Sequence, residues 1–205
     1  MTNNKSHTGA LILSGGNSSR MNYPKPFLPL GDKTFLQSIV ETYKSVGIER
    51  IVVVMNGKFC IPAYHSLLEP IKTMATIIEN HQPDDGRMHS ILLGIKAMQD
   101  LDYCYIHNVD NPFVSKETIE ELWQNRNENG YVKPTNKGRG GHPILISKTI
   151  IKQLDYNHDS SQSLKEMLAG FDERMMETAD ESVLVNINTK EDYDAMIKQH
   201  EIATL

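Results

Sequence analysis

The sequence has few cysteines and no long apolar run. Only two cysteines, Cys60 and Cys104, occur among its 205 residues, and their spacing fits neither a metal site nor a redox motif. The longest apolar runs, such as 51–55, fall far short of the roughly 20 residues that span a membrane. The amino terminus lacks the apolar centre of a secretory signal. We therefore expect a cytoplasmic protein with no membrane partner.

Positive charge is also scarce. The formal net charge is −5, with 21 Lys and Arg residues against 26 Asp and Glu residues. Nonspecific binding to a nucleic-acid backbone needs a basic surface that displaces counterions, so we expect no nucleic-acid partner. Two common phosphate-binding motifs are missing as well, because GxxxxGK[ST] is absent and no GxGxxG follows the first expected strand. This excludes a Walker-type NTPase and a Rossmann dehydrogenase.

What the sequence does have is a regular alternation of strand and helix patterns. Continuous runs of Leu, Ile and Val are typical of parallel strands that are covered on both faces, and apolar residues three and four positions apart are typical of helices. The length suits one domain, with an ordered core from about residue 8 to about residue 200. The patterns predict strands over 8–13, 51–55, 76–79, 103–109, 131–134, 144–146 and 183–187, and helices over 34–46, 62–68, 88–98, 115–123, 147–154, 161–168 and 189–199.

This alternation predicts an α/β fold. We expect a single-domain, Rossmann-like three-layer sandwich in which a mostly parallel sheet carries helices on both faces. In such sheets, ligands bind beyond the carboxyl ends of the strands. The loops after Leu13, Glu79 and Val109 are therefore the expected places for a binding site.

The first of these loops, within LILSGGNSSRMNYPKPFLPL (11–30), has the composition of a phosphate-binding loop. Gly15 and Gly16 let a ligand approach the backbone, and successive exposed amides can form an anion-binding concavity. Arg20 offers a planar set of donors for phosphate oxygens, and Lys25 offers a compact charge. Composition alone leaves an ordinary Gly- and Ser-rich surface loop equally open. Further side-chain donors are Asn17, Ser18 and Ser19.

The stretch LSGGNSSRMNYPKPFLPLGDKTFL closely resembles the signature of MobA/MocA-like nucleotidyltransferases, a group that couples an NTP to a phosphorylated acceptor. Asn22 stands where that family usually has Gly, and Asn is the next residue to tolerate left-handed dihedrals. The resemblance continues along nearly the whole chain, in GRMHSILLGI (86–95), HNVDNPFV (107–114), GGHPILI (140–146) and VNINTKEDY (185–193).

The resemblance implies a fold of the nucleotide-diphospho-sugar transferase type and roles for individual residues. Arg20, Lys25 and Asp110 are the implied catalytic residues, and Asp110 and Asn186 are the implied oxygen ligands of a Mg²⁺ cofactor. Gly141 and His142 are the implied acceptor-binding residues. The implied nucleotide-binding residues are Leu13, Ser14, Gly15, Gly16, Asn17, Ser18, Ser19, Gly86 and Ser90.

Several of these roles have a structural alternative. An Asp just before Asn-Pro, as at Asp110, is also a common turn former. Asn186 and its neighbour Asn188 can instead cap the junction between a strand and the helix that begins near Thr189. A lone His such as His142 is more often structural than functional. The site assignments therefore depend on whether the fold brings these residues together.

The implied activity is the transfer of a nucleotidyl group, CMP from CTP in the first instance, to a phosphorylated acceptor such as molybdopterin, with release of pyrophosphate. GHP within 140–146 favours CTP, because it is characteristic of the cytidylyltransferase-like members. LSGG favours GTP, because guanylyltransferase-like members usually have LAGG and cytidylyltransferase-like members LAAG. Alternatives are a sugar or alditol phosphate as acceptor, or a nucleotide-binding module without turnover. A molybdoenzyme-assembly protein is a further expected partner.

Overall fold

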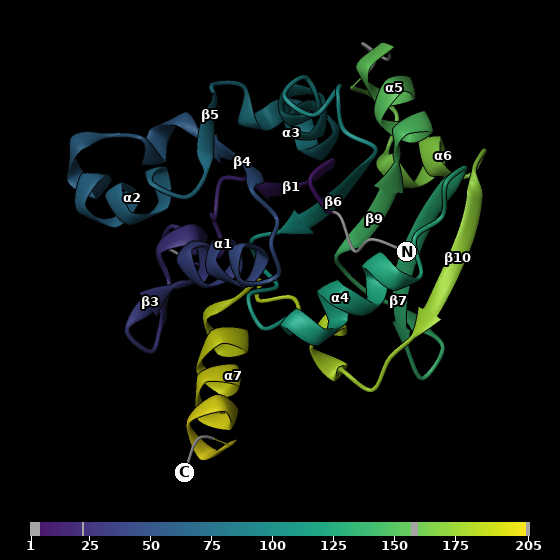
Figure 1. Cartoon of the computed structure of the whole chain (residues 1–205). Helices are drawn as coiled ribbons and strands as arrows, with labels where there is room; N and C mark the ends of the chain where they lie inside the picture. Colours follow the sequence, from purple (N-terminus) through teal and green to yellow (C-terminus); the bar gives the residue numbers. More distant parts are fainter. Residues whose placement is uncertain (1–4, 22, 157–159, 204–205) are drawn as a thin grey trace.

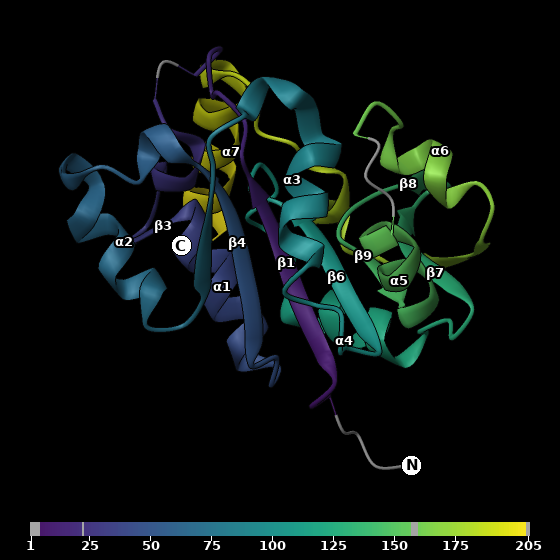
Figure 2. The same ribbon diagram turned by 90° about the horizontal axis from the view of Figure 1, so that it is seen from above.

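The computed structural model describes residues 5–21, 23–156 and 160–203, so Asn22 of the loop motif lies outside the described residues. Within them, an eight-stranded sheet has the order β10-β7-β9-β6-β1-β4-β5, with β8 paired to β7 (Figure 2). A separate hairpin joins β2 (Pro29–Leu30) and β3 (Lys33–Thr34). The strands of the large sheet are β1 (Thr8–Ser14), β4 (Arg50–Asn56), β5 (Thr76–Asn80), β6 (Tyr103–Asn108), β7 (Gly130–Asn136), β8 (Arg139–Gly140), β9 (Ile144–Ser147) and β10 (Asp172–Glu177).

Helices cover both faces of this sheet (Figures 1 and 2). One face packs against α1 (Phe35–Ser45), α2 (His65–Lys72) and α4 (Lys116–Gln124). The other face packs against α3 (Gly86–Ile95), α5 (Lys148–Tyr156) and α6 (Leu164–Leu168). The last helix, α7 (Lys190–Ala203), extends away from the sheet below α1 and α4 in Figure 1. The three-layer α/β sandwich predicted from the sequence is confirmed, and no described helix has the length and apolarity to cross a membrane.

Strand β1 shows why the central strands are continuous apolar runs. Ala10 and Ile12 point into the core beneath α1 and α4, whereas Leu11 and Leu13 point into the core beneath α3 and α5. Each of these side chains is at least nine-tenths buried. A strand that is buried on both faces has no solvent-facing positions for polar residues, which is why its sequence does not alternate.

The sheet is mostly parallel, but β9 runs against its neighbours. It pairs antiparallel with β6, where Ile144 lies opposite Ile106, and antiparallel with β7. The amino end of β9 therefore lies at the edge where β6 ends. Residues that precede β9 reach the same edge as residues that follow the parallel strands.

One expectation at the carboxyl-terminal side of the sequence was wrong, and one strand there was not predicted. Residues 183–187 do not form a strand, because Asp180 accepts a 2.9 Å hydrogen bond from the backbone of Ser182 and starts the 3₁₀ turn Glu181–Leu184. The last strand of the sheet is instead β10, which the sequence did not predict. In β10 only Met176 is buried, so an edge strand of this kind lacks the apolar run that identifies a central one.

Candidate functional site

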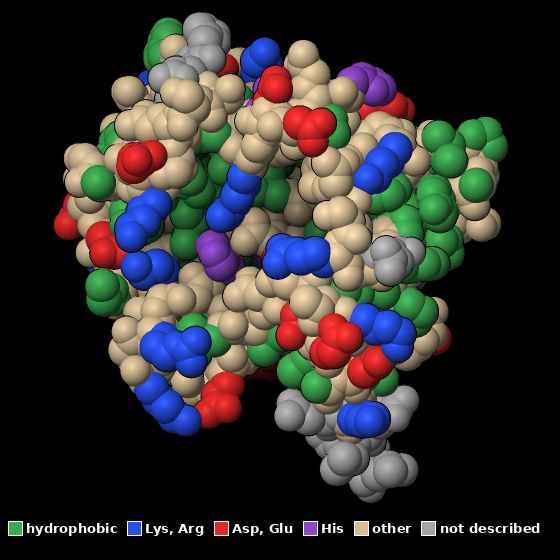
Figure 3. Space-filling model, turned by 180° about the vertical axis from the view of Figure 1, so that it is seen from behind, with side chains coloured by type: hydrophobic (Ala, Val, Ile, Leu, Met, Phe, Trp, Pro, Cys, Tyr) green, Lys and Arg blue, Asp and Glu red, His purple; other side chains and the backbone are tan. Residues whose placement is uncertain are grey.

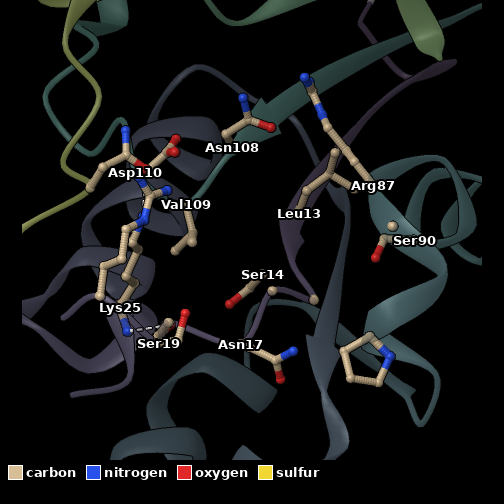
Figure 4. Close-up of a pocket in the computed structure, with 17 residues that line it drawn as sticks. Leu13, Ser14, Asn17, Ser19, Lys25, Arg87, Ser90, Asn108, Val109 and Asp110 are labelled. Atoms are coloured by element: carbon tan, nitrogen blue, oxygen red, sulfur yellow. Dashed lines mark hydrogen bonds between the residues drawn. The ribbon is translucent and has the colours of Figure 1, made fainter. Parts of the chain in front are cut away.

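A cavity of about 480 Å³ opens where β1 and β6 end (Figure 4). On the face opposite to that of Figure 1, the surface is hollowed, and basic side chains and a His gather around the hollow (Figure 3). The cavity is thus at the sheet edge expected for ligands. Its lining residues are Leu13, Ser14, Gly15, Gly16, Asn17, Ser18, Ser19, Arg20, Lys25, Pro83, Gly86, Arg87, Ser90, Asn108, Val109, Asp110 and Asn188.

The loop after β1 forms one wall, and every residue of 13–20 lines the cavity. A side chain at Gly15 would be crowded, because a Cβ at this position would lie 2.4 Å from Ser90 Oγ and 3.1 Å from Asn80 Nδ2. Ser14 Oγ is buried and has no hydrogen-bond partner among the described residues. Buried polar atoms are normally paired, so an unpaired one in a cavity wall is a candidate ligand contact.

Side chains from other loops hold this wall in place, and the sequence did not predict them. Asn17 Oδ1 accepts hydrogen bonds from Asn56 Nδ2 at 3.1 Å and from Lys58 Nζ at 3.0 Å. Lys58 also donates to the backbone carbonyl of Asn17 at 2.7 Å. Asn17 Nδ2 in turn donates to Asp84 Oδ1 at 2.9 Å. The loop is therefore supported from β4 and from the turn before α3, which reduces the ordering that a ligand must impose.

Lys25 begins the 3₁₀ turn Lys25–Phe27 and is half-buried. Its ammonium donates a 2.9 Å hydrogen bond to Asn188 Oδ1. Burial lowers the pKa of Lys25, the negative charge of Asp110 partly opposes that effect, and the positive charge of Arg20 adds to it. The three proposed catalytic residues are thus brought together around one cavity, as the sequence predicted.

Asp110 follows β6 and faces the same cavity. Its backbone carbonyl accepts a 2.8 Å hydrogen bond from the Ile187 amide, while its carboxylate Oδ1 is buried without a partner among the described residues. Burial raises the pKa of Asp110, and the charges of Lys25 and Arg87 oppose that rise. The acid therefore lies within electrostatic reach of two basic side chains.

The first turn of α3 forms the opposite wall. Gly86 has a φ of +85°, a left-handed conformation that favours glycine, and it lines the cavity with Ser90. Ser90 is buried and accepts a 3.1 Å hydrogen bond from Asn80 Nδ2. Gly86 and Ser90 are both among the residues predicted to bind the nucleotide. Arg87 lines the same wall, although no role was predicted for it.

The two predicted acceptor-binding residues lie beside the cavity and do not belong to its lining. The backbone amide of Gly141 donates to the Pro134 carbonyl at 2.8 Å, and that of His142 donates to the Val183 carbonyl at 2.9 Å. Burial lowers the pKa of His142 to about 4, with a smaller contribution from Arg87. His142 is therefore neutral at pH 7, and its buried Nδ1 has no partner among the described residues.

The two asparagines before α7 have different surroundings. Asn188 lines the cavity and binds Lys25. Asn186 is exposed, is not part of the lining, and donates a 3.3 Å hydrogen bond from Nδ2 to the Leu184 carbonyl. Because 183–187 is not a strand, the two side chains do not share a strand face. The geometry places Asn188, and not Asn186, next to the predicted catalytic residues.

The comparisons with known proteins agree with this geometry. A family model described as the MobA-like NTP transferase domain matches residues 10–192. The chain belongs to the MobA-like NTP transferase family. The matched range includes the loop after β1, the cavity walls and the segment before β9, so the whole site lies inside the domain that defines the family.

Relatives of this MobA-like chain include proteins with both nucleotide preferences. A molybdenum cofactor cytidylyltransferase of Escherichia coli (strain K12) is 26% identical over 185 residues, which cover 89% of this chain and 92% of that protein. A probable molybdenum cofactor guanylyltransferase of Clostridium perfringens (strain 13 / Type A) is 28% identical over 206 residues, covering 94% and 98%. The solved structure of a nucleotidyl transferase from Methanothermobacter thermautotroptrophicus has the same fold, with a TM-score of 0.78, 20% identity, and coverage of 97% of this chain and 99% of that one.

Proposed function

We propose that this protein transfers a nucleotidyl group from an NTP to a phosphate-bearing acceptor of the molybdopterin type and releases pyrophosphate. The observation that best supports this proposal is the set of residues that line the cavity. Arg20 and Lys25 lie at one end of a loop that contributes all of residues 13–20 to the wall. Asp110, whose Oδ1 is unpaired among the described residues, lines the same cavity. A polyphosphate can bind these cations and the backbone amides of the loop together.

The reaction needs no nucleophile from the protein. An oxygen of the acceptor phosphate attacks the α-phosphorus of the NTP and forms a new P–O bond. The bond from the α-phosphorus to the bridging oxygen breaks, and its electron pair leaves with pyrophosphate. Arg20 and Lys25 orient the triphosphate and neutralise the charge that develops on it. Positioning and electrostatic stabilisation then supply the catalysis.

Asp110 is the proposed protein ligand of a divalent cation in this site. The described residues contain no group of three or more His, Cys, Asp or Glu side chains that could enclose a metal ion. Mg²⁺ commonly needs only one or two protein carboxylates and takes its other ligands from phosphate oxygens and water. Asp110, with one buried and unpaired carboxylate oxygen, offers this kind of ligand. When bound, the ion would neutralise charge on the phosphates.

Replacement of this carboxylate tests the metal role. Asp110→Asn should lower turnover roughly 100-fold or more and raise the Mg²⁺ concentration needed for half-maximal activity. Titration of Mg²⁺ in a pyrophosphate-release assay measures both effects. An unchanged Mg²⁺ requirement in Asp110→Asn would remove Asp110 from the metal site.

The donor is proposed to be CTP first and GTP second. GHP at 141–143 precedes β9 beside the cavity and supports CTP through its resemblance to the cytidylyltransferase-like members. Gly15 supports GTP, because the cytidylyltransferase-like motif has Ala at this place and a Cβ here would lie 2.4 Å from Ser90 Oγ. The two observations come from different parts of the site. Measuring turnover with CTP and with GTP distinguishes the two donors.

The test is a pyrophosphate-release assay with the purified protein, Mg²⁺, a molybdopterin-type acceptor and each of the four NTPs in turn. We expect release with CTP, or with GTP in its place, and only in the presence of acceptor. Replacing the pterin acceptor by a sugar or alditol phosphate tests the alternative acceptors. If an NTP binds but no acceptor supports pyrophosphate release, the protein is a nucleotide-binding module and the proposed activity is wrong.

A further inference from the structure

Arg20, Lys25 and Arg87 all line the cavity, and the proposed function uses only the first two. Arg20 and Lys25 follow β1, whereas Arg87 belongs to the first turn of α3. In Figure 4, Arg87 lies on the opposite side of the cavity from Lys25 and extends toward Asn108 at the end of β6. The triphosphate is assigned to the loop after β1. Arg87 therefore carries a charge that the triphosphate assignment leaves without a function.

Asp110 interacts with basic groups from both sides. Its carboxylate feels the positive charges of Lys25 and of Arg87. Lys25 is in addition fixed by its hydrogen bond to Asn188, on the side of the loop after β1. In Figure 4, Lys25 and Asp110 lie on one side of the cavity and Arg87 lies across it, so the cavity has a triphosphate side, which contains Arg20 and Lys25, and a far side, which contains Arg87.

His142 is a further polar group near Arg87. It interacts electrostatically with Arg87, and its Nδ1 is buried without a partner among the described residues. Its main chain is held by the 2.9 Å hydrogen bond to Val183. A neutral imidazole has one nitrogen that donates and one that accepts, so it can still form hydrogen bonds with a ligand. Lys133 is also near His142, but it is already paired with Glu173 at 2.5 Å.

We propose that Arg87 and His142 form the subsite for the acceptor phosphate, across the cavity from Lys25. This inference rests on the proposed function and specifies how the second substrate is held. The ligand class is a phosphate monoester. The Arg87 guanidinium donates paired N–H groups to two phosphate oxygens, and the His142 imidazole donates a single N–H group. Another oxygen of the bound phosphate then faces the α-phosphorus.

The same chemistry could bind the β- or γ-phosphate of the donor. Binding of the acceptor phosphate can be distinguished from binding of the donor phosphates by filling the donor site first. The probe is inorganic phosphate, titrated into the full-length protein with Mg²⁺ and a saturating, non-hydrolysable CTP or GTP analogue. An acceptor subsite still binds phosphate under these conditions, whereas a second triphosphate contact does not.

Arg87→Gln is the main variant. We expect it to weaken phosphate binding to the analogue complex roughly 10- to 100-fold, because charge-assisted hydrogen bonds are lost. The affinity for the analogue itself should stay within about 2-fold. Arg87→Lys, which keeps the charge but not the paired donors, should give an intermediate loss. His142→Asn should also weaken phosphate binding.

Lys96→Gln is the matched control. It removes a positive charge from the carboxyl-terminal cap of the same helix, roughly 13 Å from Arg87 along the helix axis. Phosphate binding should not change in this variant. Thermal unfolding of each variant shows that the fold is retained.

Two results would overturn the subsite: phosphate binding that is unchanged in Arg87→Gln, or a loss of analogue affinity in place of phosphate affinity. Failure of the proposed function looks different, because the wild-type protein would then release no pyrophosphate with any acceptor, whether or not a nucleotide analogue binds. In that case phosphate is titrated into the free protein. Binding that depends on Arg87 supports the anion subsite, and binding that does not depend on it overturns the inference.

Discussion

Lys25 and Asn188 are 163 positions apart in the sequence, and the Lys25 ammonium donates a 2.9 Å hydrogen bond to Asn188 Oδ1. Asn188 is itself held by Asp192, whose carboxylate accepts from the backbone amides of Asn188 at 2.9 Å and of Thr189 at 2.8 Å. The segment before α7 therefore helps to position a lysine that belongs to the loop after β1. The position of the Lys25 ammonium in the cavity therefore depends on both ends of the chain.

Removal of the lysine should affect turnover much more than folding. Lys25→Ala deletes one preorganised contact to the triphosphate, and losses of this kind cost roughly 100- to 1000-fold in rate. Pyrophosphate release measures the rate, and thermal unfolding should show a melting temperature close to that of the wild type. Unchanged turnover would show that Lys25 has no catalytic role.

Substitution of the two asparagines before α7 should affect turnover to different extents. Asn188→Ala removes the partner of Lys25 and should lower turnover about 10-fold, since hydrogen bonds to charged groups contribute about 1.5–3 kcal/mol. Asn186→Ala should have an effect within about 2-fold, because Asn186 is exposed and bonds only its own segment among the described contacts. The same assay compares the pair. A larger loss for Asn186→Ala would restore its predicted role as a metal ligand.

Acid should destabilise the protein through His107, which is 2% exposed. Its Nε2 lies 2.7 Å from the Asn111 carbonyl, which can only accept, so Nε2 carries the proton and Nδ1 accepts from the Tyr43 hydroxyl at 2.9 Å. Burial lowers the pKa of His107 to about 4. The unfolded state, with a His pKa of about 6.5, binds more protons between these values. Stability is therefore complete above pH ~6.5 and falls as the pH drops toward 4, by on the order of 3 kcal/mol.

His107→Gln isolates this contribution, because Gln keeps one donor and one acceptor but does not titrate. Denaturant unfolding at several pH values between 4 and 7 should give a shallower pH dependence for the variant. The pKa of His142 is also lowered to about 4, mainly by burial, so most of the His142 contribution is common to both proteins. Identical slopes would contradict a neutral, buried His107.

Gly15→Ala should be unfavourable because of Ser90. The added Cβ would lie 2.4 Å from Ser90 Oγ, so the loop or α3 must shift. We expect a loss of about 1–3 kcal/mol in stability, together with weaker NTP binding. Ser90→Ala in the same chain removes the nearest atom and should recover part of both losses. A double-mutant cycle measures this coupling, and purely additive effects would contradict the contact.

Much of the fold was predictable because its central strands are buried on both faces. The apolar runs at 8–13, 51–55 and 103–109 became β1, β4 and β6, which carry the loop after β1 and Asp110. Thr34 and Ser115, at which two of the expected helices begin, cap α1 and α4 with their side chains. The loop motif then located one wall of the cavity correctly.

The remaining features depend on tertiary contacts that leave no periodic pattern. Strand β10 has only Met176 buried, so its residues do not differ from a polar loop. Lys58 and Asn56 support the loop after β1 through Asn17, but each is an ordinary polar residue after a strand. Arg87 lies within the segment GRMHSILLGI (86–95). Its proposed role depends on Asp110 and His142, which are distant in the sequence and interact with it electrostatically in the fold.

The reversed direction of β9 brings a second kind of connection to the ligand edge of the sheet. Because β9 runs antiparallel to β6, the residues that precede β9 reach the ligand edge, and those that follow it do not. The residues that precede β9 belong to a hairpin with β7 and β8. That hairpin can vary in length or composition without altering β1 or its loop. Under the proposed function, variation in this hairpin can change which ligands are recognised while the backbone of the loop after β1 stays constant.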